Sequence, residues 1–181
     1  MEKFLLKIGY AVFDHIEKYK IFKGRAIIRI LLIFYFSLIG IFLRKRRFDV
    51  YLRIGTLCMS LNWLRIASQY YEQAHAMTKD DTQLARVYIC IGNLHSHNGL
   101  HHKAIQYYEK ALDVARFKTV IFSNLAYAYE AVGDEKKALA FAEKSLEMSK
   151  KETELGHTIP QEENISPLLS RLKEKPPEPV R

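Results

Sequence analysis

Apolar and small side chains recur along the middle of the chain in a pattern that appears three times. Each copy has an aromatic residue, then an aliphatic residue beside a small one, then an alanine, and finally an aromatic-rich stretch. The alanines that mark the copies are Ala67, Ala104 and Ala138, so successive copies are offset by 37 and 34 residues. A period in this range is typical of stacked supersecondary units, each of which buries its apolar face against its neighbours.

Within each copy the apolar positions follow helical spacing on both sides of a turn. In the second copy, Ile91 and Leu94 share one helical face, Gly99 interrupts the run, and Ala104 resumes it. The pattern therefore predicts two antiparallel helices per copy. Small residues such as Gly92 and Ala104 would let the two helices approach closely, with the larger aromatic residues interlocking around them.

These residues resemble the tetratricopeptide repeat, a helix-turn-helix unit of about 34 residues. The residues that carry the resemblance are Tyr51, Ile54, Gly55, Ala67, Tyr70, Tyr71 and Ala74; Tyr88, Ile91, Gly92, Ala104, Tyr107, Tyr108 and Ala111; and Phe122, Leu125, Ala126, Ala138, Phe141 and Ser145. The resemblance implies an all-α solenoid over residues 48–151, with repeats at 48–84, 85–118 and 119–151. A non-repetitive helical bundle is the alternative.

The chain also departs from the family pattern. Cys58 and His95 stand where the family usually has tyrosine, and Ala126 replaces a glycine. The closing proline is missing from all three copies, which have Lys79, Arg116 and Lys150 in its place. The first copy carries about three extra residues, which we expect within residues 77–83. Without these prolines, the sequence does not define the residue at which each second helix ends.

The excess positive charge lies in the first quarter of the chain. Residues 1–47 contain eleven Lys and Arg and three acidic residues, whereas residues 48–181 contain seventeen of each sign. A neutral repeat region without a nucleic-acid-binding motif argues against nucleic acid as a partner. The basic first quarter indicates a segment that meets a membrane.

Residues 27–43 read IIRILLIFYFSLIGIFL, with Arg29 as their one charged side chain. As a helix, this segment would carry apolar residues on all of its faces, as in a segment that lies in hydrocarbon or in a deep core. As a helix these residues would extend about 25 Å, slightly less than a ~30 Å hydrocarbon core. We therefore predict a transmembrane helix with a basic flank over residues 26–47. The residues predicted among lipid headgroups are Arg25, Arg44, Lys45, Arg46 and Arg47. The alternatives are a re-entrant or in-plane segment and a buried helix of a soluble protein.

Ahead of this span, apolar residues recur at steps of three or four, namely Leu5, Ile8, Val12, Ile16 and Tyr19. They predict an amphipathic helix within residues 1–25, which would lie in the membrane interface or pack on the repeats. Basic residues flank the span on both sides, so the positive-inside rule leaves its orientation nearly balanced. The denser basic cluster after the span and the absence of a disulfide framework favour a single-pass membrane protein with cytoplasmic repeats.

Residues 152–175 are predicted to form a linker and a capping helix. The polar run 161–164 belongs to the linker, and Ser166 followed by Pro167 predicts the N-cap and first position of the helix. Its apolar face would contain Leu168, Leu169 and Leu172. Such a helix would cover the exposed apolar edge of the last repeat. The proline-rich residues 176–181 are expected to be disordered.

The densest group of metal-ligating residue types is Cys90, His95, His97, His101 and His102. His95 and His97 are two residues apart on a predicted helix and therefore point in different directions. We favour a solvated turn with one inter-helix histidine over a metal site. The chain contains no Gly-rich phosphate loop, nucleophile elbow or metalloprotease motif. The sequence therefore predicts a protein without catalytic activity, cofactor or metal.

The tetratricopeptide resemblance also implies a binding groove, because the first helix of each pair lines the concave face of such stacks. By this resemblance the groove residues are Asp49, Leu52, Thr56 and Met59 in the first copy, Arg86, Ile89, Asn93, Ser96 and His97 in the second, and Val120, Ser123, Tyr127 and Glu130 in the third. A chaperone-binding subclass holds a terminal carboxylate with basic and amide side chains at set positions. Here those positions carry Leu52, Thr56, Cys90, Val120 and Asn124, so that subclass is not expected.

The mixed lining suits an amphipathic helix or an extended segment of a partner protein. The predicted function is therefore a membrane-anchored scaffold or adaptor that binds a protein partner. The alternative is an assembly or regulatory subunit of a membrane complex, packed on lipid or on a neighbouring transmembrane protein.

Residues 1–47 are predicted to decide how the chain partitions. The full chain should enter the membrane fraction and resist carbonate extraction, because residues 27–43 are apolar on all sides. Residues 48–181 alone should stay soluble and helical by circular dichroism. Release of the full chain by carbonate would exclude a transmembrane helix and favour an in-plane segment.

Overall fold

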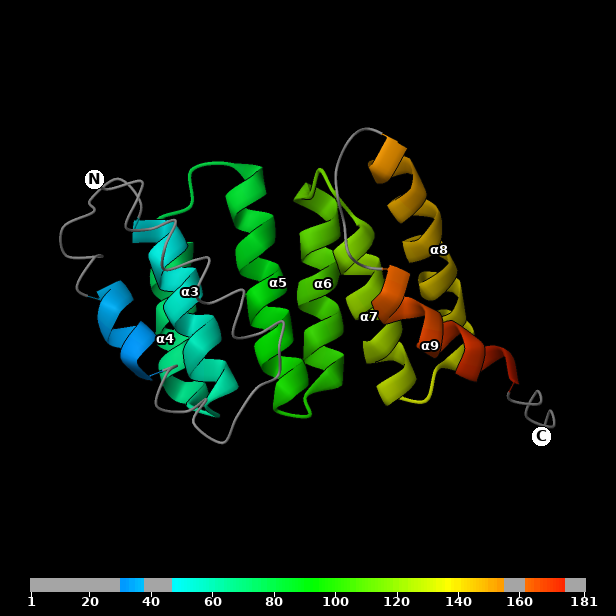
Figure 1. Cartoon of the computed structure of the whole chain (residues 1–181), viewed down its shortest axis with the longest axis horizontal. Helices are drawn as coiled ribbons and strands as arrows, with labels where there is room; N and C mark the ends of the chain where they lie inside the picture. Colours follow the sequence, from blue (N-terminus) through cyan, green and yellow to red (C-terminus); the bar gives the residue numbers. More distant parts are fainter. Residues whose placement is uncertain (1–29, 38–46, 155–161, 175–181) are drawn as a thin grey trace. The chain divides into compact units, whose positions relative to one another are not determined.

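The computed structural model describes residues 30–37, 47–154 and 162–174, all of them largely helical (Figure 1). The labelled helices are α3 (Arg47–Ser60), α4 (Leu64–His75), α5 (Asp81–His97), α6 (His101–Val114), α7 (Thr119–Ala131), α8 (Glu135–Glu154) and α9 (Glu162–Glu174). Residues 30–37 form a further short helix. The chain divides into two compact units, Met1–Lys79 and Asp80–Arg181.

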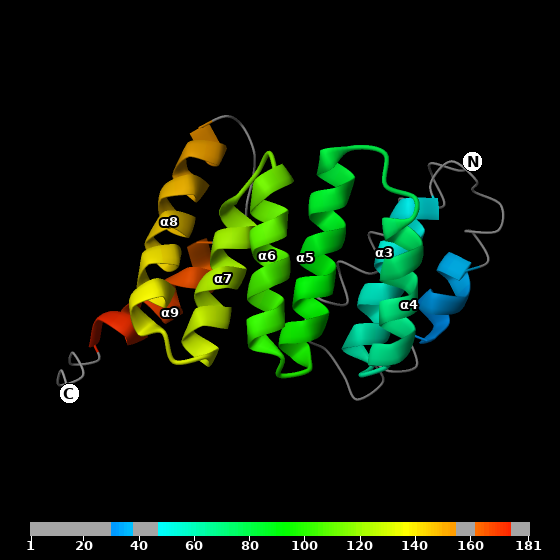
Figure 2. The same ribbon diagram turned by 180° about the vertical axis from the view of Figure 1, so that it is seen from behind.

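The helices pack in consecutive pairs: α3 with α4 in the first unit, and α5 with α6 and α7 with α8 in the second. In the second unit, both views show the two pairs side by side (Figures 1 and 2). The sequence prediction of two helices per copy, separated by a turn, is confirmed.

The turn inside each pair has the same backbone geometry. Asn62, Gly99 and Gly133 occupy the same position, five residues before the marker alanine, with φ of 63°, 72° and 83°. The next N–H then donates to the carbonyl five residues earlier: Trp63 to Cys58 at 2.8 Å, Leu100 to His95 at 2.9 Å and Asp134 to Tyr129 at 2.9 Å. This is the Schellman arrangement, which ends a helix with one residue in the left-handed conformation.

In the first two pairs, a glycine on the first helix lies against a tyrosine ring on the second. A Cβ on Gly55 would lie 2.7 Å from Cδ1 of Tyr71, and a Cβ on Gly92 would lie 2.6 Å from Cδ1 of Tyr108. The two tyrosines are only 1% and 2% exposed. Glycine is therefore required at both positions, because any side chain there would overlap a ring that the core holds in place.

The third pair is built differently, because Ala126 and Ala142 occupy the positions of the glycine and the tyrosine. α9 packs on α8 and covers this small-residue surface. The buried residues of this cluster are Ala126, Ala138, Ala142, Ile165, Leu168, Leu169 and Leu172. Two ion pairs accompany the contact, Arg171 with the half-buried Glu130 at 2.6 Å and Lys173 with the exposed Glu143 at 3.4 Å.

α9 begins earlier than the sequence indicated. The expected start at Ser166 and Pro167 was wrong: the helix begins at Glu162 and contains Pro167 in its interior, so residues 162–164 are not linker. The reason is packing, because Ile165 is 1% exposed and belongs to the same apolar face as the leucines. Proline removes one backbone hydrogen bond, and burial of a full apolar face offsets that cost.

The extra residues of the first copy lengthen the helix that follows. α5 has 17 residues, whereas its counterpart α7 has 13. Asp80 caps α5, with its carboxylate accepting a hydrogen bond of 2.8 Å from the N–H of Gln83. Residues 81–83 therefore form the first turn of α5 rather than a longer loop.

A buried carboxylate joins the end of α8 to the start of α7. Glu152 is 4% exposed, and its Oε1 accepts hydrogen bonds from the N–H groups of Lys118 at 2.8 Å and Thr119 at 3.4 Å. Within the described part of the chain, the N-cap residue of α7 makes no side-chain capping bond of its own. Glu152 thus supplies the missing acceptor from another helix and places a negative charge at the positive end of α7.

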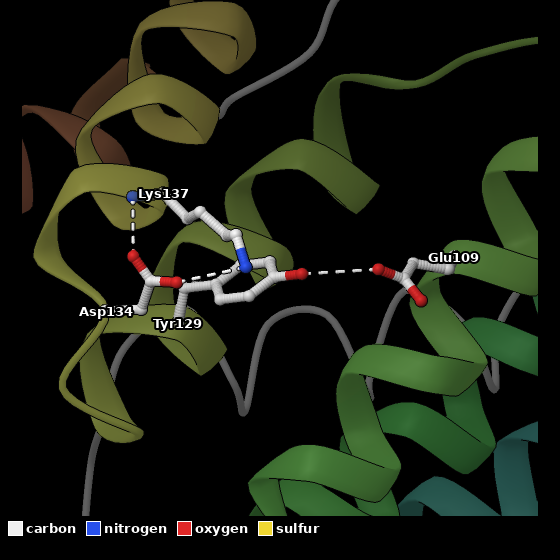
Figure 3. Close-up of polar contacts among 4 residues, drawn as sticks. All are labelled: Glu109, Tyr129, Asp134 and Lys137. Atoms are coloured by element: carbon white, nitrogen blue, oxygen red, sulfur yellow. Dashed lines mark hydrogen bonds and ion pairs between the residues drawn. The ribbon is translucent and has the colours of Figure 1, made fainter.

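Tyr129 ties the third pair to the second (Figure 3). Its hydroxyl donates to Glu109 of α6 at 3.2 Å, and its ring stacks on Phe141 of α8 with centroids 5.4 Å apart. Lys137 holds its ammonium 5.0 Å from the Tyr129 ring centroid and pairs with Asp134 at 3.1 Å. Burial, and then the charge of Glu109, raise the pKa of Tyr129.

Of the predicted membrane segment, the structure describes residues 30–37, which belong to the first unit. In residues 30–37, Leu32 and Phe36 are buried, whereas Leu31 and Phe34 are 61% and 70% exposed. No helix in the described residues is long and apolar enough to cross a membrane. The rest of the predicted span, the amphipathic helix within 1–25, the headgroup residues before Arg47 and the tail 176–181 lie outside the described residues.

Replacing a buried alanine by leucine should destabilise the fold much more than the same change at an exposed alanine. Ala104 is fully buried and Ala140 is exposed. Ala104→Leu should lower the free energy of unfolding by about 1–3 kcal/mol through overpacking, whereas Ala140→Leu should leave it nearly unchanged. Thermal unfolding of the two variants tests this, and equal melting temperatures would contradict the register.

Removing the carboxylate that caps α7 should also destabilise the fold. Glu152→Ala should cost about 1–3 kcal/mol, because the N–H groups of Lys118 and Thr119 lose their acceptor in a buried site. Glu154→Ala is the matched control, since that side chain is exposed on the same turn of α8. Urea unfolding that gives the same midpoint for both variants would rule out the capping role of Glu152.

Candidate functional site

A shallow pocket of about 300 Å³ opens in the second unit, between its first helices and the tyrosine of α6. Its lining residues are Asn93, Ser96 and His97 of α5, Tyr108 of α6, and Asn124 and Tyr127 of α7. Every one of these side chains carries a hydrogen-bonding group. The pocket therefore has the character of a polar recognition surface rather than an apolar cavity.

The side-chain amide of Asn93 links three of the residues that line the pocket. Its Oδ1 accepts two hydrogen bonds, from the hydroxyl of Tyr108 at 2.8 Å and from Nδ2 of Asn124 at 3.2 Å. Burial of the Tyr108 ring raises the pKa of its phenol, so the hydroxyl keeps its proton and acts as the donor. Three helices thus converge on one acceptor, which fixes the positions of the polar groups around it.

The two amides keep hydrogen-bonding groups that a ligand can use. Among the described residues, the bonds that these side chains make use the oxygen of Asn93 and one N–H of Asn124. An amide side chain has two N–H donors and an acceptor oxygen, so the donors of Asn93 and the acceptor of Asn124 are available. A peptide backbone, which offers alternating donors and acceptors, is complementary to such a pair.

The structure brings four of the predicted groove residues together in this pocket: Asn93, Ser96, His97 and Tyr127. Arg86 is exposed on the preceding turns of α5, and Ile89 packs partly against the core cluster of the second unit. Val120 is exposed, whereas Ser123 is 3% exposed and buried. Glu130 is half-buried and paired with Arg171 of α9.

The predicted groove residues of the first copy belong to the first unit. Leu52 is 4% exposed and lies in the core. Thr56 donates to the carbonyl of Leu52 at 2.9 Å and accepts a long hydrogen bond of 3.4 Å from Tyr71. Met59 is half-buried. The Tyr71 bond repeats the Tyr108 bond at the same spacing of 15 residues, with threonine in place of asparagine.

The histidine and cysteine group is dispersed. The His95 ring stacks on Tyr107 with centroids 5.2 Å apart, and burial, followed by the charge of Lys103, lowers its pKa. Cys90 is half-buried and Cys58 is buried, which raises the pKa of the Cys58 thiol to about 11. In the described ranges, no group of three or more His, Cys, Asp and Glu side chains is placed to hold a metal ion.

Two pocket residues were not among the predicted groove residues. Tyr108 was counted as part of the repeat pattern, and Asn124 was considered only as a carboxylate-binding position. The available signal was the presence of asparagine in the interior of two first helices, at Asn93 and Asn124. Asparagine is a poor helix former, so its use in the middle of a helix suggests a role for the side chain.

Comparison with protein families agrees with this architecture. One tetratricopeptide repeat model matches residues 48–81, and another matches residues 83–151. Together they cover more than half of the chain, which therefore belongs to the tetratricopeptide repeat family. Repeats of this family mediate protein–protein interactions. No curated protein matches the chain.

Solved structures share the fold. A crystal structure of MamA has a TM-score of 0.61 at 22% identity, over 84% of this chain and 81% of that one. The fragment of MamA from residue 41 to its end, from Desulfovibrio magneticus RS-1, has a TM-score of 0.60 at 18% identity, over 83% and 77% of the two chains. BtubC (BKLC) from P. vanneervenii has a TM-score of 0.56 at 16% identity, over 71% and 57%. At these identities the similarity concerns the fold alone.

Proposed function

We propose that this protein is a membrane-anchored scaffold that binds a segment of a partner protein in the pocket of its second unit. The observation that carries the proposal is the hydrogen-bonded set of Asn93, Tyr108 and Asn124, which holds two side-chain amides in an open pocket. The groups left over on these amides suit the main chain of an extended segment or the exposed turn of a helix. The family to which the chain belongs supports a protein as the partner.

The lining also indicates the character of the partner. His97 and Tyr127 border the pocket, and Tyr127 is 39% exposed. A half-exposed aromatic ring beside polar groups offers apolar contact area with little loss of side-chain entropy on binding. Arg86 lies seven residues before Asn93 on α5 and is exposed, which adds a positive charge on the same helical face. An amphipathic segment with an acidic residue beside its apolar anchor fits this arrangement.

Membrane anchoring is the second part of the proposal. It is supported by the apolar run of residues 27–43 and by the net charge of +8 in residues 1–47. Leu31 and Phe34, within that run, are among the most exposed large apolar side chains of the described residues. Such exposure is costly in water and favourable in contact with lipid. The anchor would hold the second unit close to partners in the same membrane.

Replacement of Arg86, Asn93 and Tyr127 by alanine should abolish capture of the partner. The expected cost in stability is small, about 1 kcal/mol, because water in the open pocket can replace Asn93 as acceptor for the Tyr108 hydroxyl. The measurement is photo-crosslinking in native membranes from a reporter residue at Ser96, with mass spectrometry of the product and thermal unfolding of the variant.

The matched control is the replacement of Gln106, Lys110 and Lys144 by alanine on the second helices. Both of these lysines lie over aromatic rings, Lys110 at 5.0 Å from Tyr107 and Lys144 at 5.2 Å from Phe141. Each contact is worth about 0.5–1 kcal/mol at an exposed site, so the control matches the groove variant in stability. If the control loses the crosslink while the groove variant keeps it, the partner binds the second helices and the pocket is not the site.

A further inference from the structure

The turn between α3 and α4 exposes two large apolar side chains next to each other. Trp63, the single tryptophan of the chain, is 41% exposed, and Ile66 is 42% exposed. Trp63 is the N-cap residue of α4 and Ile66 lies in the first turn of that helix, so both exposed side chains belong to the start of α4. Arg65 lies between them in the sequence and is also exposed. We name these three residues the α4 corner.

The repeat fold does not require apolar residues at the α4 corner. Counted back from the marker alanine, the positions of Trp63 and Ile66 carry Leu100 and Lys103 in the second copy, and Asp134 and Lys137 in the third. In the third copy the carboxylate of Asp134 accepts a capping bond from the backbone N–H of Lys137 and forms an ion pair with the ammonium of that residue, as expected for the solvated start of a helix. The turn therefore forms without apolar residues at these positions, and only the first copy carries two of them.

The charge of the first unit indicates what the α4 corner contacts. Met1–Lys79 contains fourteen basic and five acidic residues, a net charge of +9, whereas Asp80–Arg181 contains fourteen and fifteen, a net charge of −1. The first unit also contains Leu31 and Phe34, the two most exposed of the large apolar side chains in the described residues. A strongly basic unit with exposed aromatic and aliphatic side chains is complementary to an anionic lipid surface.

We infer that the α4 corner inserts into the headgroup layer of an anionic membrane, with Trp63 and Ile66 below the phosphates and Arg65 paired with them. Tryptophan is the side chain most suited to this depth, because its ring is apolar and its indole N–H retains a polar partner. α3 places 14 residues, about 21 Å of helix, between Arg47 and the turn. The first helix pair must therefore lie along the membrane surface rather than stand upright on it.

This inference rests on the proposed membrane anchoring and adds a defined contact to it. A protein partner is the less suitable occupant, because Met1–Lys79 carries a net charge of +9, of which +8 lies in residues 1–47, the part that contains the proposed anchor. The sequence that leads into α3 is also basic, at each of residues 44–47, which the sequence predicts to lie among lipid headgroups. Each basic residue near an anionic surface adds electrostatic attraction, which salt screens.

The single tryptophan allows a direct test on the full chain. The purified protein is reconstituted into vesicles of phosphatidylcholine and phosphatidylglycerol, whose acyl chains are brominated either near the headgroup or near the chain end. Flotation reports membrane association, and fluorescence of Trp63 reports the position of the α4 corner. We expect blue-shifted emission, quenching mainly by the bromines near the headgroup, and protection from aqueous iodide.

Two variants sharpen the test while keeping Trp63 as the reporter. Ile66→Lys introduces the residue found at this position in the second and third copies, and it should lose most of the quenching by lipid bromines while the chain still floats. The control Leu100→Asp replaces the second-copy counterpart of Trp63 by the residue of the third copy, and it should leave the quenching of Trp63 unchanged. The melting temperatures of both variants should equal that of the unmodified chain, because both substitutions are at exposed positions.

The outcomes separate the two proposals. If the chain floats but Trp63 stays open to iodide and is not quenched by lipid bromines, the corner does not contact the membrane, while the anchoring stands. If Trp63 is shielded from iodide but lipid bromines do not quench it, another protein segment covers the corner, and the inference fails. If the chain does not float, both the anchoring and the corner contact are wrong.

Discussion

The close approach of two helices at a glycine is the constraint on which the pocket depends. At Gly92 the backbone of α5 comes so near to the Tyr108 ring that no side chain fits between them. This contact buries the ring and at the same time directs its hydroxyl to Asn93, 2.8 Å away, which lines the pocket. The packing of the pair and the geometry of the recognition surface are therefore set by one side chain. A change that moves the ring would alter both.

The third pair lacks this contact and is completed by a different helix. With Ala126 and Ala142 in place of glycine and tyrosine, the last pair has a shallow apolar surface rather than a ring wedged between its helices. The leucine face of α9 fills that surface, and Arg171 reaches Glu130 of α7, a residue on the helix that lines the pocket. The end of the repeat array is thus closed by a helix outside the repeat pattern, as a one-dimensional stack requires at its termini.

Much of this fold could be predicted from the sequence, because the marker residues are local and periodic. The spacing of Gly92, Ala104 and Tyr108 suffices to place two helices and the turn between them. The start of α9 was missed, since Ser166 and Pro167 resemble an N-cap and only tertiary packing shows that Ile165 belongs to the buried face. The capping of α7 by Glu152 was missed for the same reason, because the two groups are more than thirty residues apart in the chain. Asn93 was predicted to line the groove, but its bonds to Tyr108 and Asn124 depend on distances that periodicity does not give.

The two units of the chain differ in net charge and in the kind of side chain that they expose. The first unit combines a net charge of +9 with exposed Trp63 and Ile66, whereas the second is nearly neutral and holds the polar pocket. In repeat arrays each helix pair contacts mainly its neighbours, so surface residues at one end can change without disturbing a site at the other. The α4 corner carries Trp63 and Ile66 at positions where the third copy carries Asp134 and Lys137, although the turns before them have the same Schellman geometry. One backbone design therefore carries an exposed apolar pair in one copy and a solvated, capped helix start in another, and the difference between them rests on the exposed side chains alone.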